Sequence, residues 1–122
     1  MLLRVRGRAL LAALENGFSR LGDAGGRFPQ LSGLSVVVDP YRPAGRRITR
    51  ALVGNAPLDP DGWYTLATTS FLAAGGEGYD ALTTAERIID ERAAGVTAVQ
   101  IFDRIAALGV IAPAIEGRIT LR

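Results

Sequence analysis

Three glycines fall within four residues in the run Gly75-Gly76-Glu77-Gly78, shortly after the aromatic side chain of Phe71 and just before Tyr79. Glycine adopts positive φ angles that other residues avoid, so this run predicts a loop whose backbone can approach a bound molecule closely. Glu77 is an acceptor-only group when ionised. The run therefore predicts a site that holds a flat ring against Phe71 and accepts hydrogen bonds through Glu77.

The same run also fits a second interpretation, in which it is a plain turn and its flanking aromatics belong to the core. For Tyr79 we favour the core position over a ligand contact. For Phe71 the residues alone leave both interpretations open.

Composition excludes several classes of chemistry. Histidine and cysteine are both absent, so the chain has no Cys/His zinc site, thiol nucleophile, histidine base or disulfide. The 14 basic residues are all arginine and face 12 acidic ones, giving a net charge of only +2. This weak and interspersed charge argues against nucleic acid as a partner.

The periodicity of apolar residues predicts an α+β fold. Helices are expected at 8–20 and 97–108, the second with a capping box at Thr97 and a stop at Gly109. A loop is expected at 21–27, and residues 83–89 fit either a helix or a short strand. Strands are expected at 2–6, 34–38, 48–53, 63–69 and 118–121.

Grouped strands and two main helices indicate one α+β domain spanning 1–122, with a mixed or antiparallel sheet of about four strands. The 48% hydrophobic content suffices for one core. No apolar stretch approaches the length of a membrane span, so a membrane partner is not expected.

Charged residues outside the glycine run give no catalytic or metal site. Arg46, Arg47 and Arg50 resemble a phosphate-binding cluster, but strand alternation puts Arg46 and Arg50 on one face and Arg47 on the other, so a solvated hairpin is expected. Arg118 is expected to pair with Glu116. Three aspartates lack the spacing of a calcium loop, so no metal site is predicted there: Asp59, Asp61 and Asp80.

Five segments, in order, make the chain resemble the carboxy-terminal domain of 5′-nucleotidases, the family of bacterial UDP-sugar hydrolases and animal ecto-5′-nucleotidases. They are GRALLAALENGFS at 7–19, GRFPQLSGL at 26–34, DPYRPAGRRI at 39–48, TSFLAAGGEGY at 69–79 and PAIEGRI at 113–119. The resemblance covers nearly the whole chain. It starts, however, after two further segments that family domains carry.

The resemblance implies a nucleotide or nucleoside as ligand. It implies that Phe71 stacks on the base and that Glu77 takes the ribose hydroxyls, with Gly75, Gly76 and Gly78 forming the substrate-binding loop. Glu77 stands where the family has Asp, and its extra methylene moves the carboxylate by about 1.5 Å. Thr69 stands where the family usually has Asn.

The resemblance also implies that the dinuclear metal centre lies in a separate metallophosphatase domain, which these residues do not contain. No cofactor is expected in this chain, and catalysis by the chain alone is not expected. The second hypothesis is a truncated, stand-alone interaction module that forms homo-oligomers through an exposed sheet edge. Family resemblance places the protein in the periplasm or at the cell surface; without a signal segment, a product of these residues alone would be cytoplasmic.

Overall fold

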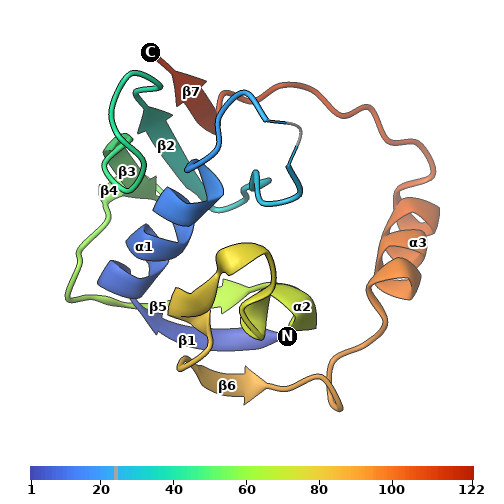
Figure 1. The fold of residues 1–122 in the computed structure, drawn as a ribbon. Coiled ribbons are helices and arrows are strands. Elements are labelled where there is room, and N and C mark those ends of the chain that lie inside the picture. Colours follow the sequence, from blue (N-terminus) through green and yellow to red (C-terminus); the bar gives the residue numbers. More distant parts are fainter. Residues whose placement is uncertain (24) are drawn as a thin grey trace.

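The computed structural model describes residues 1–23 and 25–122, and within them the strands form two sheets with helix α1 (Gly7–Gly17) between them (Figure 1). The first sheet has the order β5-β1-β6 and is antiparallel. The second has the order β4-β3-β2-β7, with β7 parallel to β2. The α+β class is confirmed, but the strands divide between two sheets where one sheet of about four was expected.

The first sheet is built from β1 (Leu2–Arg6), β5 (Trp63–Ala67) and β6 (Glu86–Ile89). The ambiguous segment at 83–89 therefore contains a strand, in which Glu86, Arg87 and Ile89 pair with the other edge of β1. The second sheet is built from β2 (Leu34–Val38), β3 (Ile48–Val53), β4 (Ala56–Pro57) and β7 (Ile119–Leu121).

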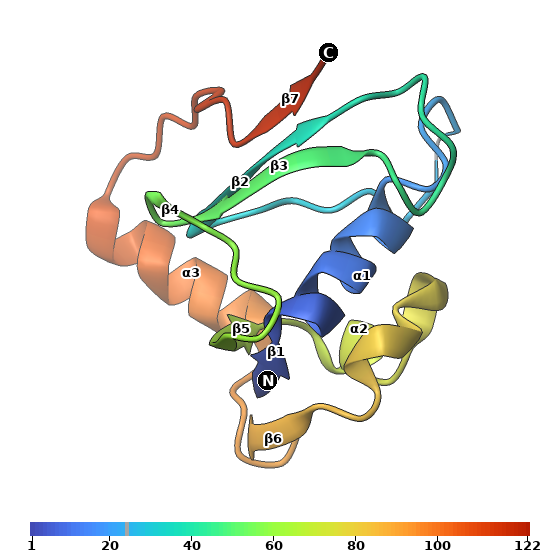
Figure 2. The ribbon, with the colours of Figure 1, turned by 90° about the vertical axis from the view of Figure 1, so that its left-hand side faces the viewer.

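The core joins the two sheets through α1. Buried side chains come from β1 (Leu3, Val5), from α1 and the residue that ends it (Leu10, Ala13, Leu14, Phe18), from β2 (Val36, Val38), and from the segment after β5 (Ala73, Tyr79, Leu82). The four-residue spacing of Leu10, Leu14 and Phe18 thus predicted the buried face of the helix correctly. Figure 2 shows α1 with β2 and β3 on one side and β1 on the other.

The end of α1 connects the helix to the hairpin between β2 and β3. The Glu15 carboxylate accepts hydrogen bonds from the backbone N–H groups of Arg47 at 2.9 Å and Ile48 at 2.8 Å. α1 ends at Gly17, earlier than the predicted boundary at residue 20. The predicted loop 21–27 contains Ala24, which lies outside the described residues.

Helix α3 (Thr97–Leu108) stands apart from both sheets (Figure 1), and none of its residues is buried. The predicted helix and its stop at Gly109, with φ +73°, are confirmed. The predicted capping box is wrong, because the N-cap position is Val96 and no side chain caps the helix. Its apolar residues Ile101, Phe102 and Leu108 are all exposed. No helix among the described residues is both long and apolar enough to cross a bilayer.

Replacing Glu15 should weaken the packing of the hairpin on α1. Glu15→Ala removes two charge-assisted hydrogen bonds, each contributing about 1.5–3 kcal/mol, so we expect a loss of about 3 kcal/mol or more in the free energy of unfolding. Glu15→Gln keeps one acceptor oxygen and should lose less. Urea denaturation measures both, with Glu91→Ala, which breaks an exposed ion pair with Arg87, as the control. Equal stabilities for Glu15→Ala and Glu91→Ala would contradict this role.

Candidate functional site

The glycine run lies in the segment after β5, which forms helix α2 (Ser70–Ala73) and the 3₁₀ turns η1 (Gly76–Gly78) and η2 (Asp80–Leu82). The Thr69 hydroxyl accepts a hydrogen bond from the Leu72 N–H at 3.2 Å and so caps α2. α2 then places Phe71 beside the loop that follows. The chain reverses at Gly75, whose φ of +91° favours glycine.

The Phe71 ring lies with one face against Gly76. A Cβ atom added to Gly76 would lie only 2.5–2.6 Å from the Cζ, Cε1 and Cε2 atoms of that ring. Because all three ring atoms would be at nearly the same distance, the added atom would sit over the ring face. The Phe71 residue is nevertheless 61% exposed, which leaves the rest of the ring open to solvent.

Glu77 has a left-handed backbone conformation, with φ +56° and ψ +22°. Among the described residues, every other residue with a positive φ angle is a glycine. Such a conformation costs an ordinary residue on the order of 1 kcal/mol or more, so the surroundings must hold it in place. Its backbone carbonyl accepts a hydrogen bond from the Asn16 side-chain amide at 3.0 Å.

The Glu77 carboxylate lies over the backbone of the loop that follows α1. A Cβ atom added to Gly26 would lie 3.1 Å from Glu77 Oε1. Glu77 itself is exposed, so its oxygens can reach a ligand in solution. The structure thus brings Phe71, Gly75, Gly76, Glu77 and Gly78 together at one surface.

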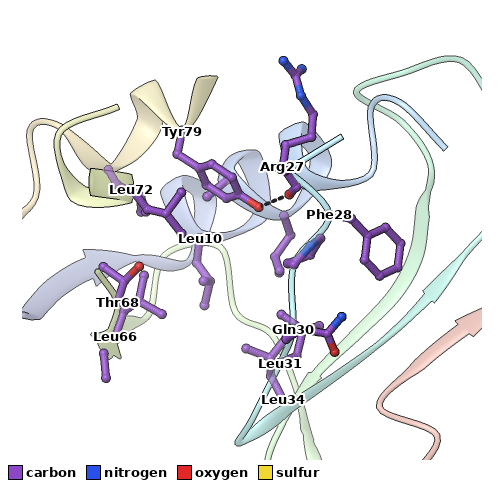
Figure 3. Close-up of a pocket in the computed structure, with 16 residues that line it drawn as sticks. Leu10, Arg27, Phe28, Gln30, Leu31, Leu34, Leu66, Thr68, Leu72 and Tyr79 are labelled. Atoms are coloured by element: carbon purple, nitrogen blue, oxygen red, sulfur yellow. Dashed lines mark hydrogen bonds between the residues drawn. The ribbon is translucent and has the colours of Figure 1, made fainter. Parts of the chain in front are cut away.

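Tyr79 occupies the core, as expected. It is 6% exposed, and its hydroxyl donates a hydrogen bond to the Arg27 carbonyl at 2.6 Å (Figure 3). Burial raises the pKa of the Tyr79 phenol above its ordinary value of 10.0; the positive charge of Arg27 opposes this shift and the negative charge of Glu77 adds to it. The bond ties the glycine loop to the loop after α1.

A cavity of about 180 Å³ lies beneath this bond, among the core side chains (Figure 3). Its walls are mostly apolar and include Leu10, Leu31, Leu66 and Leu72. Phe71 and Glu77 do not line it. The predicted binding residues therefore lie outside this cavity, at the surface formed by the glycine run.

The predictions for the charged residues are confirmed in part. Arg118 pairs with Glu116 at 3.3 Å, as predicted. The solvated position expected for Arg47 is wrong, because its guanidinium donates to the Phe18 carbonyl at 2.6 Å and to the Arg42 carbonyl at 3.0 Å. Arg46 and Arg50 are exposed. Among the described residues, no group of three or more acidic side chains lies close enough together to hold a metal ion.

Comparison with known proteins identifies the family. The family described as "5'-nucleotidase, C-terminal domain" matches residues 1–84. The chain belongs to the 5′-nucleotidase C-terminal domain family. Its resemblance to that family is thereby confirmed.

Full-length relatives are much longer than this chain. The snake venom 5′-nucleotidase of Crotalus adamanteus is 36% identical, over 96% of this chain and 21% of that protein. The 5′-nucleotidase of Bos taurus is 31% identical, over 97% of this chain and 22% of that protein. The crystal structure of the 5′-nucleotidase precursor from Thermus thermophilus matches 98% of this chain and 24% of that chain, with 36% identity and a TM-score of 0.92.

Two residues of this 5′-nucleotidase domain that support the site were not singled out from the sequence. Asn16 holds the Glu77 carbonyl, and Arg27 supplies the carbonyl for Tyr79. Both lie in segments that carry the family resemblance, at 7–19 and 26–34. Their partners are more than 50 residues away along the chain, so spacing alone gave no signal for the contact.

The Tyr79 hydroxyl should make stability fall at alkaline pH. Its pKa is higher in the folded state than in the unfolded state, so the protonated phenol stabilises the fold below pH 10, and this contribution is lost as pH rises from 10 through the folded-state pKa. Tyr79→Phe should flatten this alkaline decline and lose about 1 kcal/mol at neutral pH with the hydrogen bond to Arg27. Urea denaturation at neutral and alkaline pH measures both, with the exposed Tyr41→Phe as control. An unchanged alkaline decline in Tyr79→Phe would contradict the assignment.

Proposed function

We propose that this domain recognises the nucleoside part of a nucleotide within a 5′-nucleotidase-type phosphohydrolase. The observation that carries the proposal is the arrangement of Phe71, whose ring is covered by Gly76 on one face and which is 61% exposed overall. A planar base can stack on the exposed face, since aromatic rings prefer offset stacking. The covered face holds the ring in place before the ligand arrives.

Glu77 supplies the second part of the proposed recognition. Its exposed carboxylate lies on the same loop as Gly76, which contacts the Phe71 ring. A carboxylate accepts hydrogen bonds from two neighbouring hydroxyl groups at once, as the ribose of a nucleoside presents them. Gly75, Gly76 and Gly78 lack side chains that would keep the ligand away from the backbone.

Phosphate hydrolysis requires residues beyond this chain. The chain has no histidine and the described acidic residues form no metal-binding group, so its residues do not fit the dinuclear metal centre of the family. We propose that a metallophosphatase domain supplies this centre. The relatives support this division, since the matched part makes up only 21–22% of their length. The snake venom relatives, named for a secreted fluid, support a location outside the cytoplasm.

Helix α3 supports the proposal that the domain packs against further polypeptide of such an enzyme. Ile101, Phe102 and Leu108 are 55%, 72% and 50% exposed on a helix that stands apart from both sheets (Figure 1). The T. thermophilus match extends over 98% of the chain and therefore includes α3. A helix corresponding to α3 therefore occurs in a longer protein, since the matched part makes up only 24% of the T. thermophilus chain.

Nucleoside titration tests the recognition role. Adenosine and uridine should bind in the millimolar range, and Phe71→Ala should weaken binding by roughly 5- to 150-fold, the equivalent of about 1–3 kcal/mol for one stacked base. Glu77→Asp should strengthen binding, because aspartate is the family's residue here and tolerates the left-handed backbone better than glutamate. Calorimetry measures all three proteins.

The exposed aromatic residue Tyr41 offers a matched control for Phe71, and Tyr41→Ala should bind as the wild-type protein does. Absence of nucleoside binding at millimolar ligand by folded protein would refute the recognition role of the isolated chain. Equal weakening in Tyr41→Ala and Phe71→Ala would refute the assignment to Phe71.

The second candidate function is a stand-alone interaction module that assembles with itself. The observations that favour it are the exposed apolar residues of α3 and the edge strand β5, which pairs with β1 alone among the described strands. This function predicts a homodimer in solution, which Phe102→Glu on α3 should dissociate. Light scattering at increasing protein concentration measures it. A monomer at all concentrations would contradict the function as a self-assembling module, and it would not affect the proposed role in nucleoside recognition.

A further inference from the structure

The left-handed conformation of Glu77 needs an external constraint, and the structure contains one. Gly75 and Gly78 adopt positive φ freely, at +91° and +80°, whereas Glu77 between them carries a side chain. The hydrogen bonds from the Gly78 N–H to the Gly75 carbonyl and from the Tyr79 N–H to the Gly76 carbonyl close the turn but do not involve the Glu77 carbonyl.

Asn16 holds this carbonyl from outside the loop. Its Nδ2 donates to the Glu77 carbonyl oxygen at 3.0 Å. The same side chain lies against the next residue, because a Cβ atom added to Gly78 would be 2.9 Å from Asn16 Oδ1 and 3.6 Å from its Cγ and Nδ2. One side chain therefore contacts both ends of the 77–78 peptide group. Fixing that peptide fixes ψ of Glu77 and φ of Gly78, and so the direction in which the Glu77 carboxylate projects.

Asn16 is itself well anchored. It lies in the last turn of α1, next to Gly17. Its backbone carbonyl accepts hydrogen bonds from the Ser19 N–H at 3.1 Å and the Ser19 hydroxyl at 2.6 Å. On the other side of the loop, the Tyr79 hydroxyl is bound to the Arg27 carbonyl. The loop is thus held from a rigid helix, which is the arrangement that a precise binding group requires.

We infer that Asn16 is a positioning residue for ligand recognition: its amide holds Glu77 in the left-handed conformation and thereby aims the carboxylate at the ligand. The effect of Asn16 on ligand binding rests on the proposed function. Its effect on the conformation of the loop does not depend on any ligand. In this role Asn16 acts through Glu77 and not through a contact of its own with the ligand.

The first measurement is made without ligand. The three-bond coupling between the amide and α protons of Gly78 reports φ of that residue by NMR, one of the two angles that the 77–78 peptide group fixes. In Asn16→Ala and in Asn16→Asp, which keeps the size of the side chain but removes the donor, this coupling should move away from its wild-type value. Asn55→Ala, a change at the chain's other asparagine, should leave it unchanged. An unchanged coupling in both Asn16 variants would overturn the inference.

A rescue distinguishes positioning from a general loss of structure. In a Glu77→Gly background the loop has no side chain to strain it, so adding Asn16→Ala should change the amide shifts of residues 75–78 much less than it does in the wild-type background. Equal changes in both backgrounds would mean that Asn16 supports the fold in some other way and would overturn the inference.

The second measurement is made with adenosine. Asn16→Ala should weaken binding at least about 5-fold, the loss expected when one well-placed hydrogen bond no longer aims the carboxylate, while Asn55→Ala should bind as the wild-type protein does. Wild-type affinity in Asn16→Ala, together with a changed coupling, would overturn the role in recognition. If the wild-type protein binds no adenosine, the proposed function fails, and the coupling and the rescue still decide whether Asn16 sets the loop.

Discussion

The last turn of α1 connects the parts of this domain that the candidate site requires. Glu15 binds the backbone of the β2–β3 hairpin, Asn16 binds the Glu77 carbonyl, and Gly17 leaves room for the Tyr79 hydroxyl, which a Cβ atom there would approach to 2.7 Å. Successive residues on an α-helix point about 100° apart, so three consecutive side-chain positions can serve three different segments. Side-chain changes in this turn therefore affect a sheet, a binding loop and a core aromatic separately.

This arrangement explains how a surface loop can hold a binding group in a strained conformation. α2 places Phe71 against Gly76, and the Tyr79 hydroxyl closes the loop against Arg27. Glu77 lies between these two anchors, with its carbonyl held by Asn16. The cost of its positive φ is thus offset by contacts with residues far away in the sequence, as is common where backbone strain serves a site.

Local sequence patterns predicted much of the fold and also which residues would meet at the candidate site. Phe71 and the glycines lie close together in the sequence, so one turn is enough to join them. The strand at 34–38 and the buried face of α1 followed from spacing. The division into two sheets did not, because it depends on β1 pairing with β5 and β6, two strands far later in the chain, and not with β2 or β3.

Other features were missed because tertiary contacts decide them. Residues 86–89 form a strand since β1 offers them a free edge, although their sequence also fits a helix. Strand alternation separates Arg47 from Arg46 and Arg50, but it does not indicate that Arg47 lies beside the end of α1 and binds the Phe18 carbonyl. The apolar spacing of α3 predicted the helix but not that its apolar residues are exposed, since that depends on what packs against them.

The central claim is that the open face of Phe71, and not the cavity lined by Leu31 and Leu66, receives the base. Intermolecular nuclear Overhauser effects between adenosine and the protein test it most directly. The account predicts contacts from the adenine ring protons to the Phe71 ring, and none to Leu31 or Leu66, which line the cavity. Contacts to Leu31 and Leu66 without contacts to Phe71 would contradict it.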